Sequence, residues 1–467
     1  MLTYELKKAP GIPLYEALYR CIREDIRQGR LAAGDRLPSK RALAENLEVS
    51  KITVEGAYAA LLSEGYIRSV EKVGYFVEDG WDQGTKADSK PTKNDIFSSA
   101  DKKPTTNHMI DLTANGSPRF PFSTWSRLQR QVMLDMGEEL LKSLPNQGVP
   151  ALREAIARHL RQFRGMEVSA RNIIIGAGTD FLYNLLIQLL GREKCYAVEE
   201  PGYNKIRMIY AAGGVRCIGV PMDGQGVLPE ALADAQVLHI SPSHHYPTGI
   251  ITSPGRRKAL LSWVNQGPQR WIIEDDYDTE FRFRAHPMAA MQTQDPERVI
   301  YMNTFSKTLA ASIRISYMVL PPALMERFQK TLGFYSCTVA SFEQYTLARF
   351  LEQGYFEKHI NRMRKFYKSR RNRVLSAIAD SGIREKVTIL EQNAGLHFLL
   401  RVDTRLSDEQ LTWQFAQVGI RVRSLGSYYH ESAPARDTKT LVINYSGLSD
   451  GDLCRLEAAL GQLALIQ

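Results

Sequence analysis

Short apolar runs alternate with amphipathic stretches over most of the chain beyond residue 109. The amphipathic stretches, such as 151–161, 181–190 and 256–264, have the apolar spacing of surface helices. The runs between them are short and apolar throughout, which is typical of strands buried on both faces. This alternation predicts an α/β fold built on a mostly parallel sheet. The expected strands are 173–175, 196–198, 237–240, 271–273, 299–301 and 317–320.

The pattern changes beyond about residue 321, where long helices are expected at 343–352 and 357–379. Shorter strands at 396–402, 420–423 and 441–445 come after them. We therefore expect the body of the protein, residues 109–467, to end in a smaller α+β subdomain that begins at about residue 340.

The first 79 residues predict a separate α+β module. Apolar residues recur every four positions within 14–26, which indicates the buried face of a first helix. Ser39 and Ser50 stand where they can cap a second and a third helix. Two β-rich pieces at 66–70 and 75–77 complete the order helix, helix, helix, hairpin, which is that of a winged helix-turn-helix.

Composition limits the classes of protein that this chain can belong to. Residues 80–108 are polar, and we expect a flexible linker there. No apolar run in the 467 residues approaches the roughly 18 needed to cross a bilayer, and the N-terminus lacks a signal core. The five cysteines are scattered without CxxC spacing, which indicates reduced thiols in a cytoplasmic protein and no metal site.

The net charge of +9 does not by itself indicate DNA binding, because residues 1–79 hold 12 Lys and Arg against 12 Asp and Glu. The excess lies mostly in the larger C-terminal part. The placement of basic and polar side chains in the module predicts that it binds double-stranded DNA. Lys40 and Arg41 open the second expected helix. Ser50 and Lys51 open the third, and Lys72 lies at the hairpin tip, where a wing meets DNA.

Two segments of the larger part carry groups that suit pyridoxal 5'-phosphate (PLP). Lys307 offers an amine for an imine with the cofactor's aldehyde. Asp275, 32 residues earlier, offers a carboxylate that keeps the pyridine nitrogen protonated, and Tyr277 offers a hydroxyl to the phenolate oxygen. Tyr203 offers an aromatic face that can cover the ring.

A phosphate site is expected beside these groups. Gly178 and Thr179 lie between an expected strand and a helix, where backbone N–H groups and the helix dipole hold anions. Ser306 and Arg314 can complete it. A lone lysine or aspartate in such a loop is usually structural. It is the joint order of these groups, near the carboxyl ends of expected strands, that predicts a PLP pocket.

Residues 12–78 resemble the winged helix-turn-helix of the GntR superfamily. The resemblance implies that Arg41, Ser50 and Lys51 contact bases or phosphates. Lys51 stands where the family often has arginine, so the paired hydrogen bonds of a guanidinium to guanine are lost there. The matching runs are Gly34-Asp-Arg-Leu-Pro-Ser-Lys-Arg, Leu47-Glu-Val-Ser-Lys-Ile-Thr-Val and Glu64-Gly-Tyr-Ile.

Residues 109–467 resemble a fold-type-I aminotransferase, and their sequence motifs resemble those of the MocR regulators. This resemblance implies a PLP cofactor, a head-to-tail homodimer and a small amine effector that reshapes the dimer on promoter DNA. The matching runs are Gly148-Val-Pro-Ala-Leu-Arg, Glu199-Glu-Pro-Gly-Tyr, Ser241-Pro-Ser-His-His-Tyr-Pro-Thr-Gly, Glu274-Asp-Asp-Tyr-Asp-Thr-Glu-Phe and Thr304-Phe-Ser-Lys.

One departure from the aminotransferase pattern concerns the effector. Val442 stands where aminotransferases place the arginine that binds the substrate carboxylate, and an apolar side chain cannot do so. Either the effector lacks a carboxylate, or another cation such as Arg207 or Arg423 binds it. His245 stands where the family often has glutamine, and it is a further candidate for ligand selection.

We therefore predict a PLP-dependent transcription regulator that senses an amine or an amino-acid-like effector through aldimine exchange at Lys307. No catalytic residue is assigned. The alternative is an active aminotransferase with an accessory DNA-binding domain, and the valine at position 442 counts against it.

Overall fold

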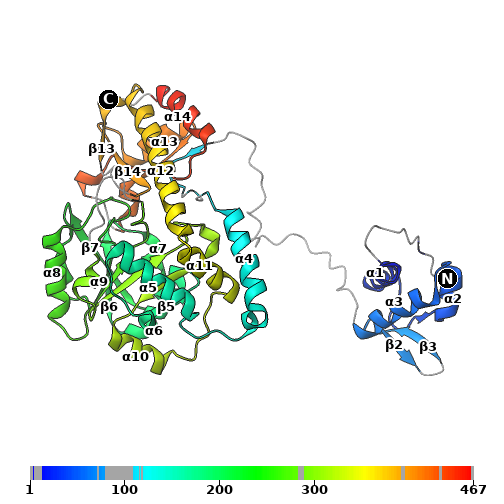
Figure 1. Ribbon diagram of the computed structural model, residues 1–467. Coiled ribbons are helices and arrows are strands. Elements are labelled where there is room, and N and C mark those ends of the chain that lie inside the picture. Colours follow the sequence, from blue (N-terminus) through cyan, green and yellow to red (C-terminus); the bar gives the residue numbers. More distant parts are fainter. Residues whose placement is uncertain are drawn as a thin grey trace. The chain divides into compact units, whose positions relative to one another are not determined.

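The computed structural model describes residues 4, 13–70, 73–78, 109–114, 116, 119–281, 289–390, 395–430 and 434–463. The chain divides into two compact units, residues 1–103 and 104–467 (Figure 1). The linker expected at 80–108 and the hairpin-tip residue Lys72 lie outside the described residues. Within the described part of the chain, no helix is both long enough and apolar enough to span a membrane.

The smaller unit has the helices and the hairpin that the sequence predicts. Ser39 caps α2 by accepting a hydrogen bond from the backbone N–H of Ala42, and Ser50 caps α3 in the same way from Thr53. A short strand ahead of α2, which was not expected, adds to the hairpin in the antiparallel order β1-β3-β2. The elements are α1 (Leu14–Arg27), β1 (Arg36–Leu37), α2 (Lys40–Asn46), α3 (Lys51–Ser63), β2 (Ile67–Val70) and β3 (Gly74–Val77).

This unit has a hydrophobic core of its own. Leu18 and Ile22 of α1 pack with Val54 and Tyr58 of α3, and all four are fully buried. Leu62, near the end of α3, is only partly buried. The core is closed by residues of the hairpin, so the three helices and the sheet fold around one centre.

An eight-stranded sheet organises the larger unit, and its strand order is β5-β12-β11-β10-β9-β6-β7-β8. The five strands from β11 to β7 are parallel, whereas β12 and β8 run antiparallel to their neighbours, so the expected mostly parallel sheet is confirmed. The strands are β5 (Ile173–Gly176), β6 (Cys195–Glu200), β7 (Arg216–Asp223), β8 (Gly226–Val227), β9 (Val237–Ile240), β10 (Trp271–Asp275), β11 (Val299–Thr304) and β12 (Ser316–Val319).

Strand β7 was missed by the sequence reasoning. It lies near the edge of the sheet, and most of its side chains are partly buried or exposed. It therefore lacks the continuous apolar run that marks the central strands. The exposed side chain of Arg216 and the proline at position 221 interrupt the pattern.

Helices cover both faces of this sheet, because successive side chains of a strand point to opposite faces. In β5, Ile173 and Ile175 join one core cluster, whereas Ile174 joins the other. Figure 1 shows the helices around the sheet. They are α4 (Phe122–Met136), α5 (Pro150–Arg164), α6 (Thr179–Leu190), α7 (Asn204–Ala212), α8 (Pro254–Asn265), α9 (Met291–Gln294), α10 (Pro322–Thr331) and α11 (Ser341–Glu352).

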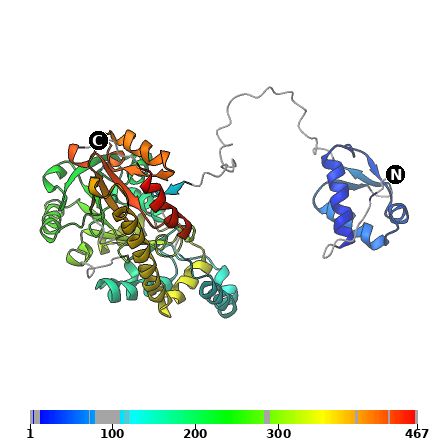
Figure 2. The same cartoon turned by 90° about the horizontal axis from the view of Figure 1, so that it is seen from above.

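The long helix α12 (Tyr355–Ala379) leads into the smaller C-terminal part, whose sheet has the order β13-β14-β17-β16. Figure 2 shows α12 beside the last helix, α14. The prediction of a single strand at 420–423 is wrong. The segment forms two short strands in different sheets, because β15 pairs with the early strand β4 and β16 pairs with β17. The elements are β4 (Ile110–Asp111), β13 (Val387–Leu390), β14 (His397–Val402), α13 (Asp408–Gln417), β15 (Ile420–Arg421), β16 (Arg423–Ser424), β17 (Thr440–Asn444) and α14 (Asp450–Gly461).

Short 3-10 turns connect several of these elements in the larger unit. They are Gly137–Leu141, Ala170–Asn172, Pro229–Leu232, Ala311–Ile313, Arg384–Lys386, Leu425–Tyr428 and Ala435–Asp437.

Candidate cofactor and DNA-binding sites

A cavity of about 360 Å³ opens at the carboxyl ends of the parallel strands, where open α/β sheets bind ligands. Its wall includes the last residues of β6, β10 and β11. Seven of the eight residues that the sequence assigns to the cofactor lie in this wall. They are Thr179, Tyr203, Asp275, Tyr277, Ser306, Lys307 and Arg314.

Asp275 is the last residue of β10, and it is buried with one oxygen bound and one unbound. Its Oδ2 accepts a hydrogen bond from the Tyr183 hydroxyl and lies 3.4 Å from Nε2 of His239. Its Oδ1 has no hydrogen-bond partner among the described residues. Burial and the charge of Asp275 hold the pKa of Tyr183 well above its usual value, so the tyrosine stays a donor. This arrangement fits a carboxylate whose free oxygen accepts a hydrogen bond from a protonated ring nitrogen in the cavity.

Lys307 follows β11 in a loop and is half-buried in the cavity wall. Burial lowers the pKa of its amine, and the charge of Asp278 opposes that shift. A lowered pKa increases the fraction of neutral amine, which is the form that attacks a carbonyl carbon. The side chain therefore has the chemistry of a nucleophile and not only that of a surface cation.

Tyr277 belongs to a buried polar chain that the sequence reasoning did not foresee. Its hydroxyl lies 3.4 Å from Nδ1 of His244, and this nitrogen lies 2.9 Å from Oδ2 of Asp278. Burial, with the charge of Asp278, keeps the pKa of Tyr277 well above its usual value. The phenol therefore remains protonated and can donate a hydrogen bond into the cavity.

The expected phosphate corner forms at the N-terminus of α6. Gly178 is the N-cap residue at φ +89°, and a Cβ there would come within 2.2 Å of Nη2 of Arg314. Arg314 lies 3.1 Å from Oδ2 of Asp180. The Oγ of Ser306 is buried without a hydrogen-bond partner among the described residues. A helix N-terminus, a guanidinium and an unsatisfied hydroxyl fit a phosphate group.

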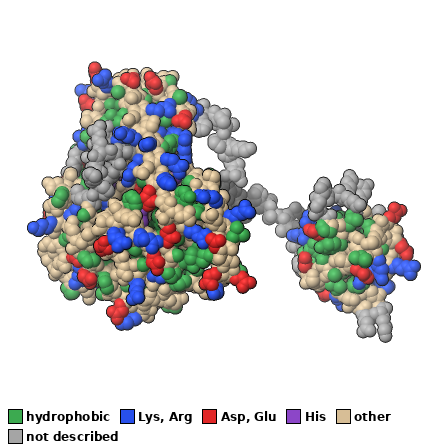
Figure 3. Space-filling model, in the orientation of Figure 1, with side chains coloured by type: hydrophobic (Ala, Val, Ile, Leu, Met, Phe, Trp, Pro, Cys, Tyr) green, Lys and Arg blue, Asp and Glu red, His purple; other side chains and the backbone are tan. Residues whose placement is uncertain are grey.

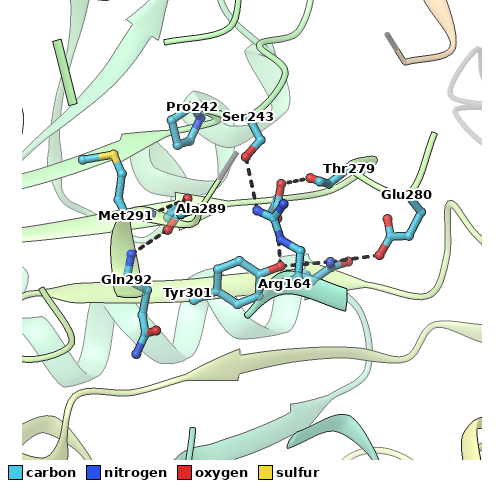
Figure 4. Close-up of polar contacts among 12 residues, drawn as sticks. Arg164, Pro242, Ser243, Thr279, Glu280, Ala289, Met291, Gln292 and Tyr301 are labelled. Carbon is cyan, nitrogen blue, oxygen red and sulfur yellow. Dashed lines mark hydrogen bonds and ion pairs between the residues drawn. The ribbon is translucent and has the colours of Figure 1, made fainter. Parts of the chain in front are cut away.

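A buried ion pair supports the segment that follows Asp275. The guanidinium of Arg164 lies 2.6 Å from Oδ2 of Asp276, and both side chains are almost fully buried. Tyr301 donates to the same oxygen at 2.8 Å, and the Thr279 hydroxyl donates to Oδ1. Figure 4 shows Arg164 beside Tyr301. Arg164 ends α5 and is 112 residues from Asp276 in the sequence, so no local pattern could have indicated this pair.

The three residues proposed for the effector are placed differently. Arg207 lines the cavity. His245 is buried outside the described cavity wall, with Nδ1 2.7 Å from the Thr248 hydroxyl and Nε2 3.5 Å from Glu199. The Arg423 guanidinium lies over the ring of Tyr428, 5.7 Å from its centre, and is likewise not among the residues that line the cavity.

Val442 is buried in an apolar cluster that includes the ring of Tyr428. It packs with Leu399, Leu425 and Tyr428, and it pairs with Arg423 across the sheet. An apolar group in a packed cluster offers nothing to a carboxylate. Among the described residues there are also no three His, Cys, Asp or Glu side chains grouped as metal ligands would be.

The helix-turn-helix presents its basic residues at the surface. Lys40 and Lys51 both lie near Glu55, at 3.9 and 3.7 Å, and Arg41 pairs with Glu45 at 3.0 Å. The Ser50 hydroxyl caps α3. Exposed cations at the first turns of α2 and α3 are available to phosphates and base edges.

Comparisons with known proteins agree with both parts. The model of the family "Aminotransferase class I and II" matches residues 107–459, and that of "Bacterial regulatory proteins, gntR family" matches residues 14–77. The chain resembles the solved multiple substrate aminotransferase of Thermococcus profundus with a TM-score of 0.66 at 22% identity. That match covers 76% of this chain and 92% of the other, and at such identity it shows the fold alone.

Relatives that share both parts are regulators. The HTH-type transcriptional regulator YdeL of Bacillus subtilis is 36% identical over 457 residues, covering 97% of each chain. The probable rhizopine catabolism regulatory protein MocR of Rhizobium meliloti is 33% identical over 465 residues, covering 95% of this chain and 92% of its own. The chain therefore belongs to the MocR-type transcriptional regulators, in which a GntR helix-turn-helix is fused to an aminotransferase class I and II domain.

Proposed function

We propose that this regulator binds PLP in the cavity of its larger unit and adjusts its action on promoter DNA when a small amine enters that cavity. One observation carries the proposal. The Lys307 amine, the unbound Oδ1 of Asp275 and the unbound Oγ of Ser306 meet around one cavity of a chain that also has a helix-turn-helix.

Different residues of the cavity would contact different parts of the cofactor. Asp275 would keep the ring nitrogen protonated, and Tyr277 would donate to the phenolate oxygen. Tyr203 would cover one face of the ring. When bound, PLP supplies an aldehyde carbon that condenses with primary amines. The residues proposed to hold its phosphate are Gly178, Thr179, Ser306 and Arg314.

Sensing follows from competition between two amines for the same carbon. Lys307 would hold that position when no effector is present, and an effector with a primary amine would compete with it. The Lys307 side chain and the effector would contact the cavity wall differently, which would shift the population of conformations available to DNA. Arg207 is proposed to hold the far end of the effector, because it lines the cavity.

The proposal makes this chain a sensor and not an aminotransferase. Val442 leaves the usual carboxylate position without a cation, and the relatives named above are described as regulators. DNA reading is proposed at Lys40, Arg41, Ser50, Lys51 and Lys72, and a head-to-tail homodimer in the cytoplasm is proposed as the acting form.

The visible absorption spectrum tests this function. The purified protein with PLP is expected to show a visible absorption band from the cofactor attached to the Lys307 amine. Titration with a panel of amines and amino acids should shift that band for one class of ligand without release of a keto acid or aldehyde. Sustained release of such a product would show an aminotransferase. The lack of any band in the presence of PLP would overturn the cofactor assignment.

A further inference from the structure

The positive charge of this chain is concentrated on one helix of the larger unit. Helix α12 contains eight Lys and Arg residues against one glutamate, a net charge of +7, whereas the whole chain carries +9. The helix-turn-helix module is neutral over residues 1–79. The part that belongs to the DNA-reading family therefore holds none of the excess, and a helix of the aminotransferase-like part holds most of it.

The cations of α12 occupy the face that points away from the core. At 100° per residue, the buried residues Phe356, Met363, Tyr367 and Val374 share one side of the helix. Figure 3 shows Lys and Arg side chains gathered where α12 lies in Figure 1. Five exposed cations lie on the side opposite the buried residues, over about 22 Å of helix. They are Lys358, Arg362, Lys365, Lys368 and Arg373.

Acidic partners do not neutralise this face. Among the described residues, no ion pair involves Arg362, Lys365 or Lys368. By contrast, Arg373 lies 3.2 Å from Asp450. The groove between α12 and α14 contains two acidic residues, Asp380 and Glu457, against the three cations Lys365, Lys368 and Arg373.

The spacing of these cations is unfavourable for the helix by itself. Lys358 and Arg362 are four residues apart, and the steps to Lys365 and then to Lys368 are three. Like charges at these spacings face each other and destabilise a helix. An anionic partner along the helix would relieve the repulsion.

We propose that the exposed cationic face of α12 is a second DNA-binding surface, which holds the phosphate backbone of the duplex that the helix-turn-helix reads. This inference rests on the proposed DNA binding by the helix-turn-helix and adds a second contact with the same duplex. Phosphates occur about every 3.4 Å along each strand, so an exposed row of cations about 22 Å long meets several of them without reading bases.

The chain is long enough for both surfaces to engage one duplex. The 30 residues 79–108 between the described units can span up to about 100 Å when extended. Phosphates held by α12 would then lie beside the sequence read by α3, and they would add affinity and salt dependence without adding sequence preference.

A triple variant of the full-length protein tests this surface. In Arg362→Ala, Lys365→Ala and Lys368→Ala, alanine keeps the helix, and the apolar side of α12 is untouched. The matched control removes three exposed cations from other elements, Arg192→Ala, Lys258→Ala and Arg327→Ala, with the same change of net charge. Both proteins are titrated, over a range of salt concentrations, with a duplex several helical turns long that contains a site selected by the wild type.

The triple variant is expected to reduce the slope of log Kd against log salt by about 2–3 and to weaken binding at least about tenfold at physiological salt. The control is expected to keep the wild-type slope. Equal slopes for the triple variant and the wild type would overturn the proposal. If the wild type itself fails to bind any duplex, the proposed function fails instead.

A measurement on the wild type avoids any effect of substitution on folding. Acylation of lysine amines, followed by mass spectrometry, reports which lysines the DNA covers. Lys365 and Lys368 are expected to be protected several-fold by the duplex, whereas Lys258 on α8 is expected to react as before. Unchanged reactivity of Lys365 and Lys368 in the complex would overturn the proposal.

Discussion

Lys307 is the residue on which the proposed sensing depends, because its amine has a pKa lowered by burial and lies in the same cavity wall as Asp275. In Lys307→Ala we expect loss of covalent PLP attachment and of the amine response, with DNA affinity changed no more than a few-fold. Absorbance and DNA titration measure the two effects.

A suitable control is Lys330→Ala, which removes an exposed lysine of α10 that pairs with Glu326. It should keep both the absorption band and the response. An amine response that survives in Lys307→Ala would contradict the proposed exchange.

Glu199 is a second titrating residue of the cavity wall, and burial raises its pKa to about 8. Its folded-state pKa is above the unfolded value, so its contribution to stability is greatest below about pH 4.5 and is lost as pH rises towards 8. Glu199→Gln keeps an acceptor for the backbone N–H of Ser241 and removes this titration. We expect the variant to gain roughly 1–3 kcal/mol relative to the wild type between pH 6 and pH 8.

Urea unfolding at the two pH values measures the difference. The neighbouring His245 does not disturb the comparison, because burial lowers its pKa to about 3 and it stays neutral in the folded protein over this range. A difference between variant and wild type that does not change with pH would show that Glu199 is ionised throughout.

At the scale of elements, the segment after β10 depends on the Arg164–Asp276 pair. Arg164→Met leaves the carboxylate of Asp276 buried without its cation, which we expect to destabilise the larger unit by about 3–5 kcal/mol. Replacing Asp276 by Asn in the same protein removes the unpaired charge, and it should recover a substantial part of the loss. Urea unfolding of Arg164→Met, Asp276→Asn and the double variant measures the coupling. Additive effects would mean that the pair does not act as a unit.

The second prediction at this scale concerns α2 and α3 of the DNA-binding module. Arg41→Ala with Lys51→Ala should weaken binding to a selected duplex and reduce the salt slope by about 2, because each cation that neutralises a phosphate adds about 1 to the slope. The control is Arg20→Ala with Arg30→Ala, because these exposed arginines are likewise paired with acidic residues. Binding that stays at the wild-type level in the first variant would mean that α2 and α3 are not the reading helices.

At the scale of the whole molecule, the chain consists of two units with separate hydrophobic cores. A ligand stabilises the unit that binds it by RT ln(1 + [L]/Kd). We therefore expect PLP at about 100 times its Kd to raise the stability of the larger unit by about 2.7 kcal/mol and to leave the smaller unit unchanged. Calorimetry with and without PLP measures this, and a shift of both transitions by the same amount would contradict it.

Much of the fold follows from interactions between residues close in sequence. Ser39 and Ser50 cap the helices that their positions predict, because a cap acts over two or three residues. The apolar runs at β9 and β10 are central strands, because a strand covered on both faces has few exposed positions to break the run. Strand β7, which lies next to the short edge strand β8, was missed for the converse reason.

The order of Asp275, Tyr277 and Lys307 along the sequence was enough to predict a PLP pocket in the larger unit. Only the tertiary structure decided which charges are paired. Arg164 meets Asp276 across 112 residues, and Glu199 lies beside His245. Among the described residues, Arg362, Lys365 and Lys368 of α12 have no ion pair, whereas Arg373 pairs with Asp450, a difference that the sequence of the helix does not show. Local sequence sets caps and periodicity, whereas the partner of a buried or exposed charge depends on which distant segments pack side by side.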